Sequence, residues 1–266
     1  MNSYNFEMLL DAYAGVGVKA GSTIYVTSDL FKVRGYEKPS GEALVEAHLA
    51  ALLDLLGPEG TLIVPTSTLN LLNTEIPFDP IETPSYYRGA LSEAVRTHPK
   101  AKRSFHPIQS YAALGPRADF FLNDVPRHSY GVGCVEWRMV QEDVTSISVG
   151  QTPARACTTM HLIEVCCGAP YRYTKEFMMN VSRNGKVLKE PYYFPVYYQD
   201  TGLTRDNNRK IFKMLESCME FKVQPLGAGK ITSYSMKDFF SHCGKIMSDD
   251  LYIWCDQLPS NRPYQK

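Results

Sequence analysis

The sequence has no excess of charge of either sign. Its 266 residues include 28 basic and 28 acidic side chains, so the formal net charge is zero with histidine counted as neutral. Without a net positive field the chain gains little from releasing counterions on a phosphate backbone, so we expect no sequence-independent binding to nucleic acid. For the same reason we expect no long-range attraction to a membrane surface.

Long hydrophobic runs are missing as well. No segment approaches the roughly 18 uninterrupted apolar residues that a membrane-spanning helix needs. The N-terminus, Met1-Asn2-Ser3-Tyr4, has neither the basic start nor the apolar run of a signal peptide. These two absences predict a cytoplasmic protein without a membrane partner.

The seven cysteines lack a pairing or metal-binding pattern. They are odd in number and include no C-x-x-C pair, so they indicate neither a disulfide framework nor a thiolate zinc site. We expect reduced, mostly buried thiols. No H-E-x-x-H motif or phosphate-binding glycine loop is present, and no metal is expected.

What the sequence does contain is an alternation of helix and strand in its first third. Residues 5–14 have apolar side chains at helical spacing, and residues 22–26 form a short β-branched run typical of a strand. Residues 41–56 predict a long amphipathic helix that ends at Gly57-Pro58, and residues 61–64 predict a buried strand. Two strands joined through such a helix form a right-handed βαβ unit with parallel strands.

Later segments complete a single predicted α/β domain over residues 1–266. The further elements are a loop at 74–88, a short helix at 89–97, strands at 110–114 and 146–149, and a hairpin within 171–198 that turns at Asn184-Gly185. No repeat or low-complexity linker divides the chain. We therefore expect a central mixed sheet flanked by helices, with a β-rich C-terminal elaboration.

Two of the six histidines lie in dense polar surroundings. His48 lies on the apolar face of the helix at 41–56 and is typical of a packed core residue. His106, by contrast, lies in the polar run 103–110, and His161 lies in Thr158-x-x-His161-x-x-Glu164.

The spacing of Thr158, His161 and Glu164 suits a general base. If residues 157–166 form a helix, the hydroxyl, imidazole and carboxylate lie on one face. A carboxylate beside an imidazole fixes its tautomer and makes proton removal from an amine feasible near neutral pH. The same spacing also fits an ordinary surface pair of His and Glu. Cys157 is a weaker candidate as a nucleophile, because its neighbours are apolar.

Taken together and in order, the motifs resemble a known family, the aminoglycoside 3-N-acetyltransferases, also called antibiotic N-acetyltransferases. The resemblance covers about residues 20–175, with a weaker similarity at Gly229-Lys230-Ile231. It rests on five motifs: Thr27-Ser28-Asp29-Leu30 followed by Gly35; Leu56-Gly57-Pro58-Glu59-Gly60-Thr61-Leu62-Ile63-Val64-Pro65-Thr66; Phe78-Asp79-Pro80 with Thr83-Pro84-Ser85 and Gly89-x-Leu91-x-Glu93; the most specific run, residues 103–115; and Thr158-x-x-His161-x-x-Glu164.

The resemblance implies a fold distinct from the GNAT acetyltransferases and direct acetyl transfer from acetyl-CoA to an amine. His161 would be the general base, and Thr158 and Glu164 would orient it or bind substrate. The cofactor-binding residues implied are Thr27, Ser28, Asp29 and Leu30 for pantetheine, and Arg103, Ser104 and Ser110 near the CoA phosphates. Asp29 stands where the family has a serine, which puts a carboxylate near the thioester path.

Two segments of opposite charge bear on the acceptor. Glu75, Asp79 and Glu82 form an acidic stretch, which suits a polycationic aminoglycoside, whereas residues 171–190 carry a net charge of +3. A basic site would suit a phosphate-bearing acceptor such as a nucleotide-linked amino sugar. The remaining substrate-binding candidates are Asp79, His106 and Asp200. The resemblance also implies an acidic partner for His161 from a later strand, for which Asp200 is the nearest candidate.

Three classes of function follow from these observations. The first hypothesis is an N-acetyltransferase acting on an amine of an amino sugar, with a small-molecule acceptor and CoA as its partners. The others are a non-catalytic CoA-binding module and a cysteine or metal hydrolase. Nothing in the sequence specifies the acyl chain length or an oligomeric state.

Overall fold

The computed structural model describes residues 3–199, 201–204 and 209–265, and in these residues the main element is a mixed sheet of seven strands in the order β3-β4-β2-β1-β5-β9-β8. At its centre β1 (Thr23–Ser28) runs parallel to β2 (Thr61–Pro65) on one side and to β5 (Thr145–Val149) on the other. The outer strands run antiparallel to their neighbours: β4 (Tyr111–Leu114), β3 (Lys102–Arg103), β9 (Gly229–Ser235) and β8 (Lys222–Leu226).

Side chains of the central strands alternate between two faces, and helices cover both. Ile24 and Val26 belong to the core on one face, whereas Tyr25 belongs to the core on the other. The first face is covered by α1 (Phe6–Gly15), α2 (Gly41–Leu56) and α3 (Ala90–Arg96). The second is covered by α4 (Ala118–Leu122), α5 (Val135–Gln141), α7 (Thr159–Cys166) and α9 (Met236–Asp249).

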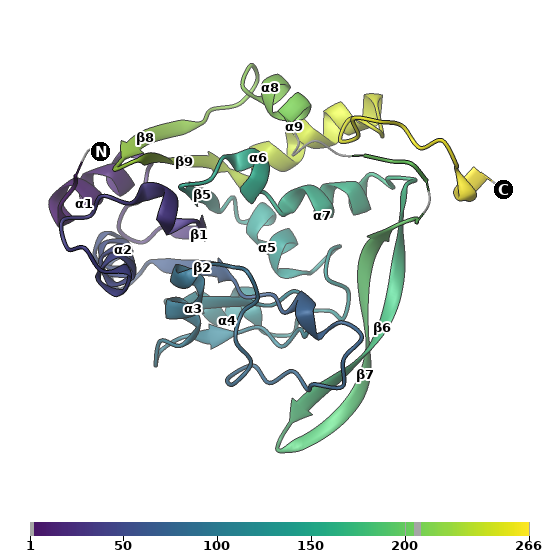
Figure 1. The fold of residues 1–266 in the computed structure, drawn as a ribbon, viewed down its shortest axis with the longest axis horizontal. Coiled ribbons are helices and arrows are strands. Elements are labelled where there is room, and N and C mark those ends of the chain that lie inside the picture. The colour runs from purple at the N-terminus through teal and green to yellow at the C-terminus, as the bar shows by residue number, and fades with distance from the viewer. Residues whose placement is uncertain (1–2, 200, 205–208, 266) are drawn as a thin grey trace.

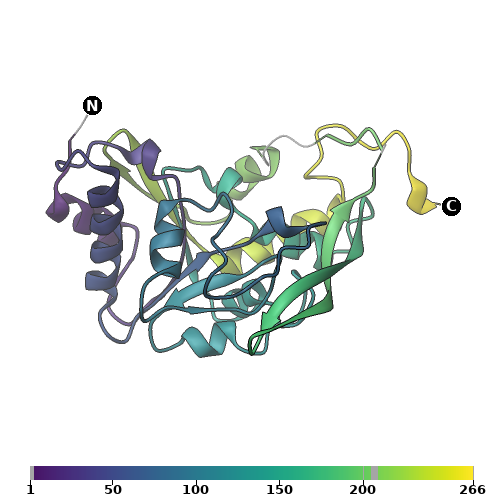
Figure 2. The ribbon, with the colours of Figure 1, turned by 60° about the horizontal axis from the view of Figure 1, so that its bottom comes forward.

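The predicted βαβ unit and the predicted hairpin are both confirmed. Helix α2 spans residues 41–56 as expected, and the Ser40 hydroxyl caps it by accepting from the Ala43 amide at 3.0 Å. The hairpin consists of β6 (Arg172–Arg183) and β7 (Lys186–Tyr197), which pair along their whole length. It lies at the opposite end of the molecule from α1 and α2 (Figures 1 and 2). Asn184 and Gly185 both have positive φ, which matches the two-residue turn expected there.

His48 is the core residue that the sequence predicts. It is fully buried, its Nδ1 lies 2.6 Å from the Tyr13 hydroxyl, and its Nε2 lies 3.2 Å from the Tyr4 hydroxyl. Burial lowers the pKa of His48 to about 3. The imidazole is therefore a neutral part of the packing between α1 and α2.

The C-terminal part is less purely β-rich than expected. It adds β8 and β9 to the main sheet and contributes α9 and the short α8 (Arg209–Leu215). Strand β8 lies at a sheet edge and contains Pro225, so it lacks the apolar alternation that marks a strand in a sequence. Helix α6 (Pro153–Ala156) was also missed, because a single turn is too short to show helical periodicity. The remaining short helices are η1 (Leu30–Val33), η2 (Leu69–Leu71) and η3 (Pro263–Gln265).

The parallel centre of the sheet places three loops at one edge. Strands β1, β2 and β5 end at this edge, at Ser28, Pro65 and Val149. Because β1 lies between β2 and β5 in the sheet, the chain leaves β1 toward one neighbour and returns later to the other. Ligands of open α/β sheets bind outside such a point. The Asp29 amide donates to the Val149 carbonyl at 2.9 Å, so the loops after β1 and β5 are in contact. Within the described ranges, no helix has the length and apolar character to cross a bilayer.

The contact between these loops yields a stability test at Gly150. A Cβ on Gly150 would lie 2.3 Å from the Asp29 carbonyl oxygen, and its φ is +69°. We expect Gly150→Ala to lose roughly 2–4 kcal/mol of unfolding free energy in urea denaturation, from left-handed strain plus the clash. Gly21→Ala is the matched control, since Gly21 has φ +76° with open space around it. That control should lose only about 1 kcal/mol. Equal losses in the two variants would contradict the close approach.

Candidate active site

Helix α7 carries the predicted imidazole and carboxylate. His161 Nδ1 lies 3.0 Å from Glu164 Oε2, and Thr158 is the residue that precedes the helix at its N-cap. The His161 side chain is 24% exposed, whereas Glu164 is fully buried. The helix expected at 157–166 is therefore present, and it holds a solvent-accessible imidazole against a carboxylate inside the protein.

Glu164 is stabilised by two residues from the start of the hairpin. The Tyr171 hydroxyl donates to Oε1 at 2.9 Å, and Arg172 Nε lies 2.8 Å from Oε2. The Arg172 guanidinium also lies 3.8 Å above the Tyr197 ring, and its Nη2 is 2.9 Å from His161 Nδ1. A buried carboxylate requires compensation of this kind. No motif in the sequence marked Tyr171 and Arg172 as site residues; the available signal was an arginine at the start of a strand otherwise rich in aromatic residues.

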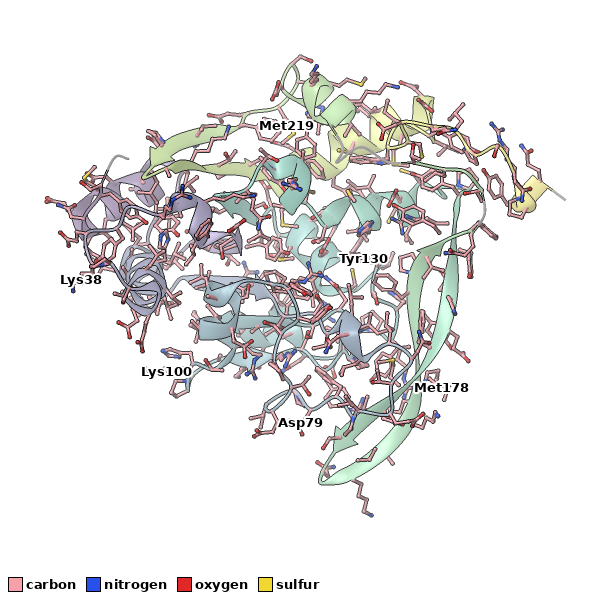
Figure 3. All side chains as sticks on the ribbon, viewed as in Figure 1. Lys38, Asp79, Lys100, Tyr130, Met178 and Met219 are labelled. Carbon is pink, nitrogen blue, oxygen red and sulfur yellow. The ribbon has the colours of Figure 1, made fainter. Side chains whose placement is uncertain are left out.

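A second buried carboxylate lies beside Thr158. Glu136 of α5 is fully buried, and its Oε1 accepts hydrogen bonds from the hydroxyls of Thr158 and Tyr111, both at 2.6 Å. Burial raises the pKa of Glu136, although the hydrogen bonds from Thr158 and Tyr111 act in the opposite direction. The ring of Tyr130 packs edge-on against the His161 ring with centroids 5.4 Å apart. Tyr130 lies between α5 and the hairpin in Figure 3. No sequence motif marked Glu136.

The four residues at the end of β1 are mostly buried. Thr27 Oγ1 lies 3.5 Å from the Ile147 carbonyl, and the buried Ser28 Oγ has no hydrogen-bond partner among the described residues. Asp29 forms an ion pair with Lys32 at 3.3 Å, and Leu30 packs into the core. The loop thus offers the hydroxyl of Ser28 and the carboxylate of Asp29 at the sheet edge, next to a group of basic side chains.

Two adjoining cavities lie beyond the carboxyl end of β5, with volumes of about 520 Å³ and 290 Å³. Both are lined by Thr152 and Lys230, and together they are called here the basic trough. Its cations are Lys32, Arg34, Arg155, Lys213 and Lys230. Phe212 and Phe221 also line the larger of the two cavities. Cations beside aromatic rings suit a ligand that combines phosphates with a flat ring. Helix α6 forms part of the wall, and the chain continues from it to Thr158.

Arg103, Ser104 and Ser110 lie close together, and their hydrogen bonds hold neighbouring loops in place. Arg103 donates from Nη2 to the Thr66 carbonyl at 2.7 Å and from Nη1 to the Thr83 carbonyl, and its guanidinium lies 4.9 Å from the centre of the Phe78 ring. Ser110 donates to the Thr66 carbonyl at 2.8 Å, and the Ser104 hydroxyl accepts from the Tyr111 amide at 2.9 Å. The structure therefore does not bring these three to the basic trough, and their assignment to CoA stays a prediction.

His106 and Asp79 are likewise held by their own loops. His106 Nδ1 accepts from the Gln109 amide at 3.0 Å and its Nε2 lies 3.2 Å from the Arg127 carbonyl. Burial lowers the pKa of His106 to about 3. Asp79 Oδ1 accepts from the Ile81 amide at 2.8 Å, and in Figure 3 Asp79 is well separated from Tyr130. Neither residue is brought to His161. Asp200 lies outside the described residues.

The acidic and basic segments of the sequence pair with each other. Lys189 Nζ lies 3.7 Å from Glu75 Oε1, and the Asn180 amide donates to Glu75 Oε2 at 2.8 Å. Within the hairpin, Arg183 Nε lies 3.0 Å from Glu190 Oε1. With Arg172 held by Glu164, three of the five cations at 171–190 already have an acidic partner. The basic stretch is therefore largely neutralised within the protein.

Four of the seven thiols are buried, whereas Cys166 and Cys218 are exposed and Cys167 is half-buried. The buried four are Cys134, Cys157, Cys243 and Cys255. Burial raises the pKa of Cys157 to about 12, so its thiolate is scarce at neutral pH. In the part of the chain that the structure describes, no three His, Cys, Asp or Glu side chains come together as a metal site would need.

Comparisons with known proteins give one family. A family model described as aminoglycoside 3-N-acetyltransferase matches residues 26–248. Aminoglycoside N(3)-acetyltransferase III of Salmonella sp is 30% identical over 200 residues, which make up 68% of each chain. Aminoglycoside N(3)-acetyltransferase IX of Micromonospora chalcea is 29% identical over 169 residues, covering 57% of this chain and 58% of the relative.

Solved structures share the fold at lower identity. The room-temperature neutron/X-ray structure of sisomicin-bound AAC-VIa has a TM-score of 0.81 at 19% identity, and the match covers 93% of this chain and 99% of the AAC-VIa chain. The AAC-IIIb binary with CoASH has a TM-score of 0.79 at 19% identity, and the match covers 98% of this chain and 100% of the AAC-IIIb chain. The predicted fold class, with a mixed sheet flanked by helices, is therefore confirmed.

The buried state of His106 predicts a pH dependence of stability. Its pKa is about 3 in the folded chain against an ordinary 6.5, so as pH falls from about 6.5 to 3 the unfolded chain gains a proton that the folded chain does not. Unfolding free energy should fall over this range by up to about 1.4 kcal/mol per pH unit for this residue. His106→Gln should reduce that slope in denaturation curves measured at several pH values. Parallel curves for the two proteins would contradict a neutral buried imidazole.

Proposed function

The chain belongs to the aminoglycoside 3-N-acetyltransferase family and is an acetyl-CoA-dependent N-acetyltransferase, and we propose that it acetylates an amine of an aminoglycoside with His161 as the general base. The observation that carries this proposal is the buried Glu164 carboxylate at His161 Nδ1, 3.0 Å away. A carboxylate only accepts, so it favours a proton on Nδ1 and puts the basic lone pair of the neutral imidazole on Nε2.

Arg172 competes for the same imidazole nitrogen. Its Nη2 donates where Glu164 accepts, so the two partners of Nδ1 favour opposite tautomers. We assign control to Glu164, because Arg172 already pairs through Nε with Glu164 at 2.8 Å and through Nη2 with the Tyr197 hydroxyl at 2.5 Å. The guanidinium then neutralises the carboxylate and keeps it in place.

The proposed reaction is direct transfer. His161 Nε2 removes a proton from the acceptor amine as its nitrogen attacks the thioester carbonyl, and a nitrogen–carbon bond forms. The carbon–sulfur bond then breaks, and CoA leaves as a thiolate that takes the proton from the imidazolium. Atoms and charge balance, with an amide and free CoA as products. Positioning amine and thioester beside one base supplies much of the acceleration.

The basic trough is the proposed site of the nucleotide end of acetyl-CoA. Its cations outnumber its one lining carboxylate, Glu216, and favour phosphates, although Lys32 also pairs with Asp29; Phe212 and Phe221 offer apolar surface for adenine. The trough adjoins the loop that contains Ser28 and Asp29, which is the proposed path of pantetheine. Thr158 follows helix α6, which forms part of the wall of the trough, and would then lie next to the thioester.

The acceptor proposed is an aminoglycoside and not a phosphate-bearing sugar. The argument for a nucleotide-linked amino sugar depended on the basic stretch at 171–190, whose cations Arg172, Arg183 and Lys189 are paired within the protein. A non-catalytic CoA-binding module would have no use for an imidazole held by a buried carboxylate. A cysteine hydrolase is disfavoured by the buried Cys157 thiol.

Replacement of His161 tests the proposed base. His161→Ala should lower kcat roughly a thousandfold, within the range for loss of general base catalysis, as measured by mass detection of the N-acetylated aminoglycoside. Cys157→Ala is the control and should retain kcat, as should chelator treatment of the wild type. CoA binding without turnover on any aminoglycoside or amino-sugar nucleotide would instead favour the binding module.

Lys230 tests the proposed donor site, because it lines both cavities of the trough. Lys230→Gln should raise the KM for acetyl-CoA roughly tenfold, the usual effect of losing one charge-assisted contact to phosphate, while kcat and the acceptor KM stay the same. Lys245→Gln, on α9 and outside the trough, is the matched control. If both variants keep the wild-type KM, the nucleotide binds elsewhere.

A further inference from the structure

We infer that Glu136 is a positioning residue for acetyl transfer: its buried carboxylate holds the Thr158 hydroxyl so that the Thr158 oxygen accepts a hydrogen bond from the amine being acetylated. The inference rests on the proposed function, which places Thr158 beside His161 in the reaction site. It assigns a role in that site to a carboxylate from α5, an element that contributes none of the residues proposed from the sequence.

The direction of each hydrogen bond around Glu136 follows from what each group can donate. Glu136 Oε1 accepts from both neighbouring hydroxyls, so Thr158 and Tyr111 each donate a proton to it at 2.6 Å. The Tyr111 oxygen in turn accepts from Gln109 Nε2 at 2.9 Å. The amide of Gln109 therefore fixes one end of the chain of hydrogen bonds, and Thr158 forms the other.

This arrangement leaves the Thr158 oxygen as an acceptor. The Thr158 hydroxyl donates its proton to Glu136. Although Thr158 is the N-cap residue of α7, its side chain makes no capping hydrogen bond to that helix. The Tyr25 hydroxyl lies 3.4 Å from the Thr158 oxygen, which is a long contact. A hydroxyl held in this way cannot stabilise the developing oxyanion, because that requires a donor. It can accept an N–H of the amine and so direct the nitrogen lone pair to the thioester.

Glu136 occupies a position where an apolar side chain would pack at less cost. It is fully buried on the face of the sheet that holds Tyr25 and Tyr111, and its Oε2 makes no hydrogen bond of good geometry to the described residues, although the Thr159 hydroxyl also interacts with the carboxyl group. Leaving one buried polar oxygen unsatisfied costs about 1–3 kcal/mol. Arg88 is the cation whose charge opposes that of Glu136. A local cost of this kind is expected where a residue serves function.

A double-mutant cycle tests the inference. Glu136→Leu should lower kcat for an aminoglycoside roughly tenfold to a hundredfold, with the acetyl-CoA KM within about twofold of wild type, since the trough is untouched. Glu136→Gln keeps an acceptor oxygen for Thr158 and should retain kcat within about fivefold. In the background of Thr158→Val, which removes the hydroxyl, Glu136→Leu should have no further effect on kcat.

Two more variants separate positioning from packing. Tyr111→Phe removes the other donor to the same oxygen but leaves Thr158 its acceptor, so it should lower kcat much less than Glu136→Leu, whereas a packing role predicts comparable losses in the two variants. If Glu136→Leu does not fold, Glu136→Met provides the same cycle with a longer apolar side chain.

The outcomes distinguish this inference from the proposed function. Additive losses in the double mutant, or full kcat in Glu136→Leu, overturn the inference while the role of His161 stands. Full activity in both His161→Ala and Thr158→Val would overturn the proposed function and the inference with it. Three results together support the inference. Glu136→Leu lowers kcat, Glu136→Gln keeps kcat near the wild-type value, and Glu136→Leu lowers kcat no further in the Thr158→Val background.

Discussion

The buried carboxylate of Glu164 is the constraint on which the site depends. A charge inside a protein is stable only when other groups oppose it, and Glu164 obtains this from Tyr171, Arg172 and His161. Two of these residues begin the hairpin and the third lies on α7. One carboxylate therefore fixes the root of the hairpin against α7 and orients the imidazole. Figure 1 shows the root of the hairpin beside the end of α7. The fold and the chemistry share the same contact.

Local patterns predicted the main helices and strands of the first hundred residues, but not β3 or α4 and not the role of every polar residue. Helix α2 and its flanking strands follow from periodicity and from the Gly57-Pro58 stop. The i,i+3 spacing of His161 and Glu164 also predicted their contact. The polar run at 103–110 looked like a ligand site for the same reason, yet Arg103 and His106 bind carbonyls from residues 83 and 127. Partners so distant in the sequence cannot be read from spacing.

The neutral total charge hides two different arrangements of cations. Three of the five in the hairpin, Arg172, Arg183 and Lys189, are paired with carboxylates, the last with Glu75 of the neighbouring loop. Those of the basic trough come from separate segments, Lys32 and Arg34 after β1, Arg155 on α6, Lys213 on α8 and Lys230 on β9. Counting charge along the sequence found the first group and missed the second, because only the fold brings the second together. Glu136 was missed for a similar reason, since only the fold places α5 beside α7.

A crystal structure of the chain with CoA and an aminoglycoside tests the central claim most directly, namely that Glu164 holds His161 so that Nε2 is the base. We predict an acceptor nitrogen about 3 Å from His161 Nε2, with the CoA sulfur on the far side of that nitrogen and Glu164 still bound to Nδ1. An acceptor amine bound away from Nε2, with His161 turned toward Arg172, would contradict the account.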